Sequence, residues 1–234
     1  MEEWYYNEHR QVGIDFSSEE EVKIYDEKFK TSRNFDSEAE LIIKAAGLNK
    51  SSSVLEIGSG TGELTLRLAK HCKKVTACDI SDTMLSYTDK KICQSGLNNV
   101  NFVNAGFLYD KFQTDSFDAV ISQLTLHHLP DFWKSVAINN IYGILKEGGV
   151  FYLMDSILSF DMDIFKSAIN GTILYARGKI SDKVANEIII NIRDEYPTFN
   201  WIIEGMLRRN GFSIDRKIRY TDFISVYISS KQEQ

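Results

Sequence analysis

Cysteine is scarce in this sequence of 234 residues, and positive charge is not in excess. The three cysteines, Cys72, Cys78 and Cys93, are odd in number and lack the spacing of metal ligands, so they indicate neither a disulfide framework nor a zinc site. The formal net charge of −6 argues against broad attraction to nucleic acid. We therefore expect a cytoplasmic protein with no bound metal and without nucleic acid as a partner.

Long apolar runs are also absent. No stretch reaches the roughly 18 apolar residues that a membrane span requires, and the start at residues 1–4 has neither the basic region nor the apolar core of a signal peptide. We expect a protein that is neither exported nor embedded in a membrane. A hydrophobic content of 43% is enough for a sizeable core, and the length suits one domain.

Apolar runs and helical patterns alternate through the middle of the chain. The strands expected from these runs are residues 54–57, 74–79, 100–104, 117–122 and 150–155. Helical patterns occupy residues 63–71, 83–95 and 132–145. Alternation of this kind gives a parallel sheet with helices on both faces, and ligands then bind at the carboxyl ends of the strands.

Both ends of the chain depart from this alternation. Two leading helices are expected at residues 17–30 and 36–46, the first capped by Ser17 or Ser18 and the second by Asp36. Later helical patterns lie at residues 160–193, as two helices, and at 201–209. Residues 212–219 and 223–230 are strands with so short a connection that only an antiparallel hairpin can join them.

The most informative feature is the segment Val54–Gly62, where a strand breaks into three glycines at alternate positions and a helix follows. Glycine allows positive φ and the close approach of another molecule, and a helix N-terminus offers unpaired N–H groups to an anion. The next strand ends in Asp79, whose carboxylate can accept hydrogen bonds from both hydroxyls of a ribose. The segment therefore predicts a cofactor site.

These patterns together predict one α/β domain spanning residues 1–234. Its sheet is Rossmann-like, doubly wound and seven-stranded, mostly parallel with a C-terminal antiparallel hairpin. The predicted parts are an N-terminal helical lid at residues 1–35, a cofactor-binding core at 36–155, a helical cap insertion at 156–197, and a terminal helix and hairpin at 198–234.

A nicotinamide-binding fold also places glycines and an acid in such positions. Its fingerprint is Gly-x-Gly-x-x-Gly, whereas here the third glycine, Gly62, comes one residue earlier and Glu56 precedes the loop. The terminal hairpin is a further argument against a dehydrogenase.

Five motifs, in this order and spacing, resemble those of the class I S-adenosylmethionine-dependent methyltransferases of the small-molecule type. They are Glu56–Gly62, Asp79–Leu85, the strand start Phe117–Val120, the turn His127–Pro130 and the turn Leu145–Gly149. The resemblance covers residues 36–155, and the terminal helix and hairpin match the family's usual end. It implies S-adenosylmethionine as the cofactor and methyl transfer by in-line displacement, in which the protein mainly positions the reactants.

The resemblance also implies which residues bind the cofactor. They are Tyr25, Arg33, Glu56, Gly58, Ser59, Gly60, Gly62, Asp79, Ile80, Met84, Gly106, Phe107 and Gln123. The glycine loop would pass beside the amino-acid portion, Glu56 would orient that loop or meet the ammonium group, and Asp79 would take the ribose hydroxyls. Ile80 and Met84 would pack on the adenine or belong to the core. Arg33 would pair with the cofactor carboxylate or lie on a solvated helix face.

One position departs from the family pattern. After the third strand many relatives carry an acid that meets the adenine amino group, and this sequence has Gly106 there, followed by Phe107. The amino group would then be met by a backbone carbonyl, by Asn104 or by water, while Phe107 would stack or fill the core.

Two histidines, His127 and His128, follow the fourth strand and would lie beside the reactive sulfonium. A histidine with an ordinary pKa near 6.5 can deprotonate an attacking oxygen, nitrogen or thiol, which makes His128 the candidate catalytic residue. The alternative is a structural turn, in which Pro130 starts the next helix.

The expected methyl acceptor is a small molecule, selected by the leader, the loop at residues 127–133 and the helical cap. Neither Asn-Pro-Pro-Tyr nor Pro-Cys follows the fourth strand, so the sequence does not indicate base amino groups as acceptors or a cytosine-type nucleophile. Two alternatives remain, namely a methyltransferase acting on RNA or protein and a cofactor-binding regulatory protein without turnover.

Overall fold

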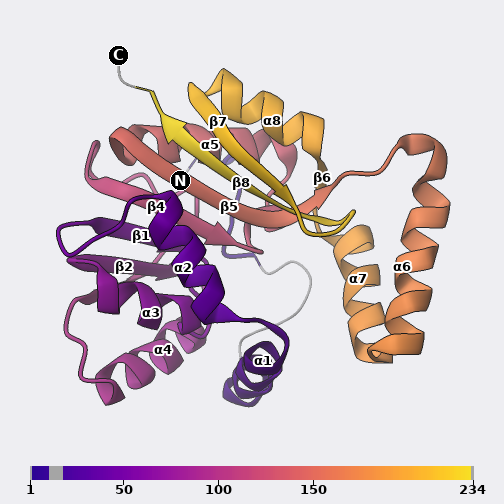
Figure 1. Ribbon diagram of the computed structural model, residues 1–234, viewed down its shortest axis with the longest axis horizontal. Helices are drawn as coiled ribbons and strands as arrows, with labels where there is room; N and C mark the ends of the chain where they lie inside the picture. The colour runs from indigo at the N-terminus through magenta and orange to yellow at the C-terminus, as the bar shows by residue number, and fades with distance from the viewer. Residues whose placement is uncertain (1, 11–17, 233–234) are drawn as a thin grey trace.

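A mixed sheet with helices on both faces forms the protein in the computed structural model, which describes residues 2–10 and 18–232 (Figure 1). The strands are β1 (Ser53–Ile57), β2 (Lys74–Asp79), β3 (Val100–Asn104), β4 (Phe117–Gln123), β5 (Leu145–Leu158), β6 (Thr198–Phe199), β7 (Phe212–Arg219) and β8 (Ile224–Lys231). Their order is β3-β2-β1-β4-β5-β8-β7, with β6 beside β5. Strands β1 to β5 are parallel, and β8 is antiparallel to β5 and β7. The predicted Rossmann-like sheet with its terminal hairpin is confirmed.

The described residues form the α-helices α1 (Glu19–Ser32), α2 (Phe35–Ala45), α3 (Glu63–His71), α4 (Asp82–Gln94), α5 (Asp131–Ile144), α6 (Phe165–Lys179), α7 (Asp182–Asp194) and α8 (Asn200–Arg209). Helices cover both faces of the sheet, and those that pack on it present an apolar stripe to it. Leu64 and Leu68 of α3 lie one turn apart and are buried in a core shared with α2, while Ile138 of α5 and Ile203 of α8 are buried in the core of the opposite face. Burial of each such side chain contributes about 1.5–3 kcal/mol.

The chain order creates a switch point between β1 and β4. From β1 the chain proceeds outward to β2 and β3, and then returns to place β4 on the other side of β1. The connections after β1 and β4 therefore leave the sheet in opposite directions, which opens a crevice at the carboxyl ends of these strands. The glycine loop follows β1 at this position.

Several predicted boundaries differ from the structure. Asn34, and not Asp36, caps α2 by accepting a hydrogen bond from the Ser37 N–H at 3.0 Å, while Asp36 pairs with Arg67 of α3 at 2.5 Å. Strand β5 begins five residues earlier than predicted, and the two-residue strand β6 was missed. At α1 the Ser18 hydroxyl accepts from the Glu21 N–H, whereas Ser17 lies outside the described residues.

The helical insertion stands beside the sheet rather than on one of its faces. In Figure 1, α6 and α7 form an antiparallel pair beyond β6, joined to the end of β5. Two contacts fix α7: Lys28 of α1 pairs with Glu187, and the Ser156 hydroxyl donates to Asn191 at 2.8 Å. Across residues 2–10 and 18–232, every helix is too short or too polar to traverse a bilayer.

Candidate active site

A cavity of about 400 Å³ lies at the carboxyl ends of β1, β2 and β4, at the switch point. Ten of the predicted site residues line it: Tyr25, Gly58, Gly60, Asp79, Ile80, Met84, Gly106, Phe107, Gln123 and His128. Arg33, Glu56, Ser59 and Gly62 do not line it. The leader, predicted as a lid, contributes residues 8–10 to the cavity wall, although only Tyr25 and Arg33 had been named as its site residues.

The glycine loop is built for close approach. The N–H groups of Gly58 and Ser59 both donate to the Cys78 carbonyl at 2.8 Å, which ties the loop to the end of β2. Gly58 has φ +75°, and a Cβ there would lie 2.2 Å from Thr125 Oγ1; Gly62 has φ +76°, and its Cβ would lie 2.2 Å from the Thr88 side chain. Glycine is required at both positions because of the positive φ and the lack of space.

Asp79 organises the same loop. Its Oδ2 accepts from the Gly60 N–H and its Oδ1 from the Ser81 N–H, each at 2.9 Å. Burial raises the pKa of this carboxyl, and the backbone donors oppose the rise. Each oxygen can accept a second hydrogen bond, so Asp79 retains the capacity to hold two hydroxyl groups in the cavity.

Glu56 has a structural role in this structure. Its buried carboxyl accepts from the Thr65 hydroxyl at 2.6 Å and so links β1 to α3. Burial raises its pKa to about 8, an effect that the Thr65 hydrogen bond opposes. The predicted contact with a cofactor ammonium stays a prediction.

We expect Glu56→Gln to stabilise the protein at alkaline pH. In the unfolded chain Glu56 ionises near pH 4.5, whereas the folded protein holds its proton to about pH 8, so its contribution to stability is lost as pH rises through this window. Glutamine accepts from Thr65 without ionising. The variant should gain about 2 kcal/mol, or about 5 °C in melting temperature, at pH 9 and almost nothing at pH 4.

Thermal unfolding followed by differential scanning fluorimetry from pH 4 to pH 9 measures this difference. The matched control is Glu147→Gln, which changes an exposed glutamate in the turn within β5. If the two variants had equal shifts in melting temperature at pH 9, the ionisation of Glu56 would not destabilise the folded protein.

The predicted lid residue Arg33 pairs with the protein itself. Its guanidinium donates to both carboxylate oxygens of Glu38 and to Gln123 Oε1 at 2.6 Å, and Gln123 Nε2 donates to Glu38 at 3.1 Å. These contacts place Gln123 at the cavity wall. A pairing of Arg33 with a cofactor carboxylate stays a prediction. Tyr25 lies in the same wall, and burial raises its pKa to about 12, so its hydroxyl remains protonated.

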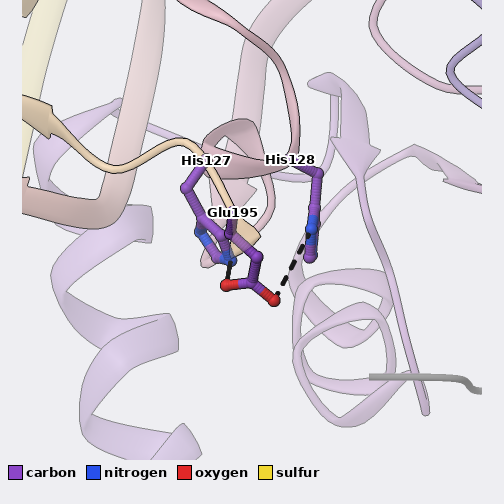
Figure 2. Close-up of side chains that lie close together, drawn as sticks. All are labelled: His127, His128 and Glu195. Atoms are coloured by element: carbon purple, nitrogen blue, oxygen red, sulfur yellow. Dashed lines mark ion pairs between the residues drawn. The ribbon is translucent and has the colours of Figure 1, made fainter. Parts of the chain in front are cut away.

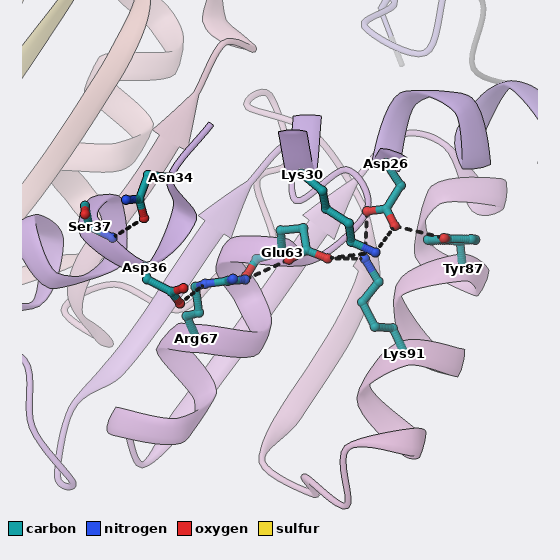
Figure 3. Close-up of polar contacts among 9 residues, drawn as sticks. All are labelled: Asp26, Lys30, Asn34, Asp36, Ser37, Glu63, Arg67, Tyr87 and Lys91. Carbon is teal, nitrogen blue, oxygen red and sulfur yellow. Dashed lines mark hydrogen bonds and ion pairs between the residues drawn. The ribbon is translucent and has the colours of Figure 1, made fainter. Parts of the chain in front are cut away.

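Helix α1 is held over the site by a buried charge network (Figure 3). Asp26 accepts from Lys91 of α4 at 2.8 Å and from Lys30 at 2.6 Å, and Lys91 also donates to Glu63 of α3 at 2.7 Å. The Tyr87 hydroxyl completes the contact with Asp26 at 3.0 Å. Asp26 therefore fixes the lid helix to α3 and α4 and does not face the cavity.

The two histidines have different surroundings, because Glu195 at the end of α7 lies between them (Figure 2). His127 is buried, with Nδ1 at 2.6 Å from Asp155 Oδ1 and Nε2 at 3.3 Å from Glu195 Oε2. His128 lines the cavity, and its Nδ1 lies 4.0 Å from Glu195 Oε1. His127 is therefore a structural residue, whereas His128 can reach a ligand.

Electrostatics separates the two rings further. Burial alone would lower the pKa of His127, but Asp155 and Glu195 outweigh it and raise the pKa to about 9. Burial and the positive charge on His127 lower the pKa of His128 to about 4, although Glu195 acts in the opposite direction. At neutral pH His127 is thus an imidazolium and His128 a neutral imidazole.

The same cluster contains groups that can bind a metal. Ligand atoms of His127, His128 and Glu195 all lie within 4.8 Å of one another. In this structure His127 Nδ1 lies 2.6 Å from Asp155 and Nε2 lies 3.3 Å from Glu195, so the ring bridges two carboxylates. We call His127, Asp155 and Glu195 the carboxylate–histidine cluster.

Sequence reasoning missed Glu195, Asp155 and Glu8 as site residues. Asp155 ends the predicted fifth strand and accepts from the Leu126 N–H at 2.7 Å, a position that the carboxyl-end rule for parallel strands would have indicated. Glu195 and Glu8 lie 68 and 100 residues from the groups they meet, His127 and Leu108, in segments with no local signal.

The chain is similar to known methyltransferases in sequence. Residues 54–149 match the family model described as a methyltransferase domain. The C-methyltransferase UbiE of ubiquinone and menaquinone biosynthesis from Marinomonas sp. (strain MWYL1) is 35% identical over 46% of this chain and 43% of its own length. An uncharacterized methyltransferase from Geobacillus sp. (strain WCH70) is 26% identical over 85% of both chains. The chain spans about half the length of the UbiE relatives it matches.

Solved structures show the same fold. An S-adenosylmethionine-dependent methyltransferase from Clostridium acetobutylicum superposes with a TM-score of 0.68 at 15% identity, over 92% of this chain and 98% of that one. The methyltransferase-domain match over residues 54–149, the methyltransferase relatives and this shared fold together support a class I S-adenosylmethionine-dependent methyltransferase. The [4+2]-cyclase SpnF also superposes, with a TM-score of 0.66 at 15% identity over 85% of this chain and 81% of that one, so the fold alone does not fix the reaction.

The residues of this methyltransferase chain fit the family's cofactor, S-adenosylmethionine. Gly60 lines the cavity with nothing within 4 Å of where a Cβ would lie, so a ligand can come close to the backbone there, and Asp79 can accept from two ribose hydroxyls. Ile80 and Met84 supply apolar surface beside Asp79 in the same cavity. Leu124, with φ 54°, also lines the cavity, and backbone strain of this kind clusters at ligand sites.

Proposed function

We propose that the protein transfers a methyl group from S-adenosylmethionine to a small molecule whose attacking atom lies beside His128. The observation that carries this proposal is one cavity of about 400 Å³ that contains both Asp79 and His128. The ribose-binding carboxylate and the neutral imidazole thus border the same space. Leader residues 8–10 form part of its wall, which suits an enclosed small acceptor better than a polymer.

The residues of the chain act mainly by positioning. When bound, the cofactor supplies a methyl group that its sulfonium already activates. Holding an acceptor in line with that methyl contributes several kcal/mol by proximity. His128 is unprotonated at neutral pH. As the attacking atom of the methyl acceptor bonds to the methyl group it becomes more acidic, and His128 takes up the proton that it loses. Glu195 Oε1, at 4.0 Å, stabilises the resulting imidazolium.

Label transfer tests the reaction class. The protein is incubated with methyl-tritiated S-adenosylmethionine and with the small-molecule, RNA or protein fraction of a cell extract. We expect label in the small-molecule fraction. Label in RNA or protein would overturn the small-molecule acceptor. Binding of S-adenosylmethionine in a calorimeter without label in any fraction would overturn the methyl transfer and support a cofactor-binding protein without turnover.

Removal of the proposed base should lower turnover and leave cofactor binding almost unchanged. We expect His128→Asn to reduce kcat about 100-fold, the lower end of the range for loss of a general base, while the affinity for S-adenosylhomocysteine changes less than threefold. Since the pKa of His128 is about 4, wild-type kcat should be constant from pH 8 down to about pH 5.

Initial rates with the acceptor found by label transfer measure kcat between pH 4 and pH 8. The matched control is His9→Asn, which changes another histidine in the cavity wall. An acidic limb near pH 6.5 in the wild type would contradict the lowered pKa of His128, and equal kcat values in His128→Asn and wild type would show that His128 is not the base.

A further inference from the structure

A carboxylate from the leader lies inside the cavity at the end of β3. Both oxygens of Glu8 lie 3.1 Å from the Leu108 N–H, and that carboxylate forms part of the cavity wall. The side chain is mostly buried, which raises its pKa, while the N–H groups of residues 106–108 stabilise its charged form. Glu8 is therefore a partly desolvated acceptor directed at the ligand space.

Gly106 and Glu8 occupy complementary positions. A Cβ at residue 106 would lie 2.3 Å from Glu8 Oε2 and 2.5 Å from its carboxyl carbon. Any side chain at this position would displace the leader carboxylate. The Glu8 carboxylate thus occupies the space that a side chain at residue 106 would need, although the two residues are 98 positions apart in the chain.

The position of Glu8 relative to Asp79 determines what it can meet. In the β2–β3 pair Asp79 is in register with Asn104, and the Ala105 N–H donates to the Asp79 carbonyl. Gly106 is two residues beyond that point, in the loop that follows β3, and β3 itself lies about 4.8 Å from β2. A base attached to a ribose held by Asp79 would then reach over the end of β3, where Ile80, Met84 and Glu8 line the same cavity.

Other polar groups at this end are less suited to meet the base. The Asn104 side chain donates to Asp82 Oδ1 at 2.5 Å and to the Ile80 carbonyl at 3.4 Å. Asp82 is exposed, so water competes for its carboxylate. Glu8 combines an ionised acceptor with partial burial, which makes its hydrogen bond to a neutral donor worth more.

We propose that Glu8 recognises the exocyclic amino group at C6 of the cofactor's purine, and that the leader thereby gives the site its preference for adenine. The proposal rests on the proposed use of S-adenosylmethionine. A 6-amino group donates to the Glu8 carboxylate. A 6-oxo group in the same place presents an acceptor to that carboxylate, and the two repel.

Two ligands that differ at this atom test the proposal by calorimetry with the full-length protein. One is S-adenosylhomocysteine, and the other is its deaminated analogue, S-inosylhomocysteine. We expect the wild type to bind the adenine ligand about 50-fold more tightly, as loss of a hydrogen bond to a charged group predicts. In Glu8→Gln the amide can accept from Leu108 and donate to the 6-oxo group, so the preference should fall below about threefold.

The gain in affinity of Glu8→Gln for the inosine ligand is the decisive readout, because a leader that is merely loosened would weaken both ligands. Glu3→Gln, an exposed glutamate in the same leader, is the matched control and should keep the wild-type preference. Equal preference in the wild type and Glu8→Gln would overturn the role of Glu8. Failure of the wild type to bind either ligand would instead contradict the use of this cofactor.

Discussion

Replacement of Asp155 with asparagine is expected to lower the melting temperature by about 10 °C at pH 6, the largest stability effect of any single change considered for this chain. Asp155 accepts from His127 Nδ1 and from the Leu126 N–H, at 2.6 and 2.7 Å, in a buried site. Without its charge, the imidazolium keeps only Glu195 as a partner. Loss of one member of a buried ion pair costs about 3–5 kcal/mol.

The effect should depend on pH in a defined direction. The pKa of His127 is raised from 6.5 to about 9 in the folded protein. The charged His127 ring therefore stabilises the folded protein fully below pH 6.5, and this stabilisation is lost as pH rises through about 9. The difference in melting temperature between the wild type and Asp155→Asn should narrow above pH 9.

Scanning calorimetry from pH 5 to pH 10 measures this difference. Asp194→Asn, which changes an exposed aspartate next to Glu195, is the matched control and should leave the melting temperature nearly unchanged. Two results would contradict the stabilising ion pair of Asp155 with His127 in the carboxylate–histidine cluster. One is a melting temperature of Asp155→Asn within 2 °C of the wild type at pH 6, and the other is a difference in melting temperature that is the same at every pH.

Replacement of Asp79 with alanine is expected to weaken the binding of S-adenosylhomocysteine about a thousandfold. The carboxylate can hold two ribose hydroxyls, and each hydrogen bond to a charged group is worth about 1.5–3 kcal/mol. The change also removes the acceptor for the N–H groups of Gly60 and Ser81, so the glycine loop loses part of its support.

Isothermal titration with S-adenosylhomocysteine measures the affinity. Asp79→Asn keeps an acceptor oxygen and should fall between alanine and the wild type. Asp89→Ala, an exposed aspartate on α4, is the control for general effects on that helix. An affinity for Asp79→Ala within threefold of the wild type would show that this carboxylate does not hold the ribose.

Most of the fold could be predicted because its signals are local. The alternation of apolar runs with helical patterns predicted β1 to β5 and the helices between them, and the short connection after Arg219 predicted the hairpin of β7 and β8. Strand β6 has only two residues and pairs only because the insertion returns to Ile157 and Leu158. Such a strand has no periodicity of its own, so no sequence pattern could indicate it.

Part of the cavity wall could also be predicted from local sequence signals. Gly58, Gly60 and Asp79 lie within single strand-to-helix connections, where backbone chemistry alone indicates a ligand, and all three line the cavity. Glu56 was expected to orient the glycine loop or to meet the ligand, because it precedes the loop. Its side chain instead points to Thr65, since alternate residues of a strand face opposite sides.

By itself, the sequence determined the sheet, the glycine loop and the acid at the end of β2, because each depends on residues close together in the chain. The tertiary structure decided which charges meet. It brought Glu195 between His127 and His128, so that one ring is protonated and the other neutral, and it placed Glu8 against Gly106. These pairings depend on how segments far apart in the sequence pack, and burial then sets the strength of each interaction.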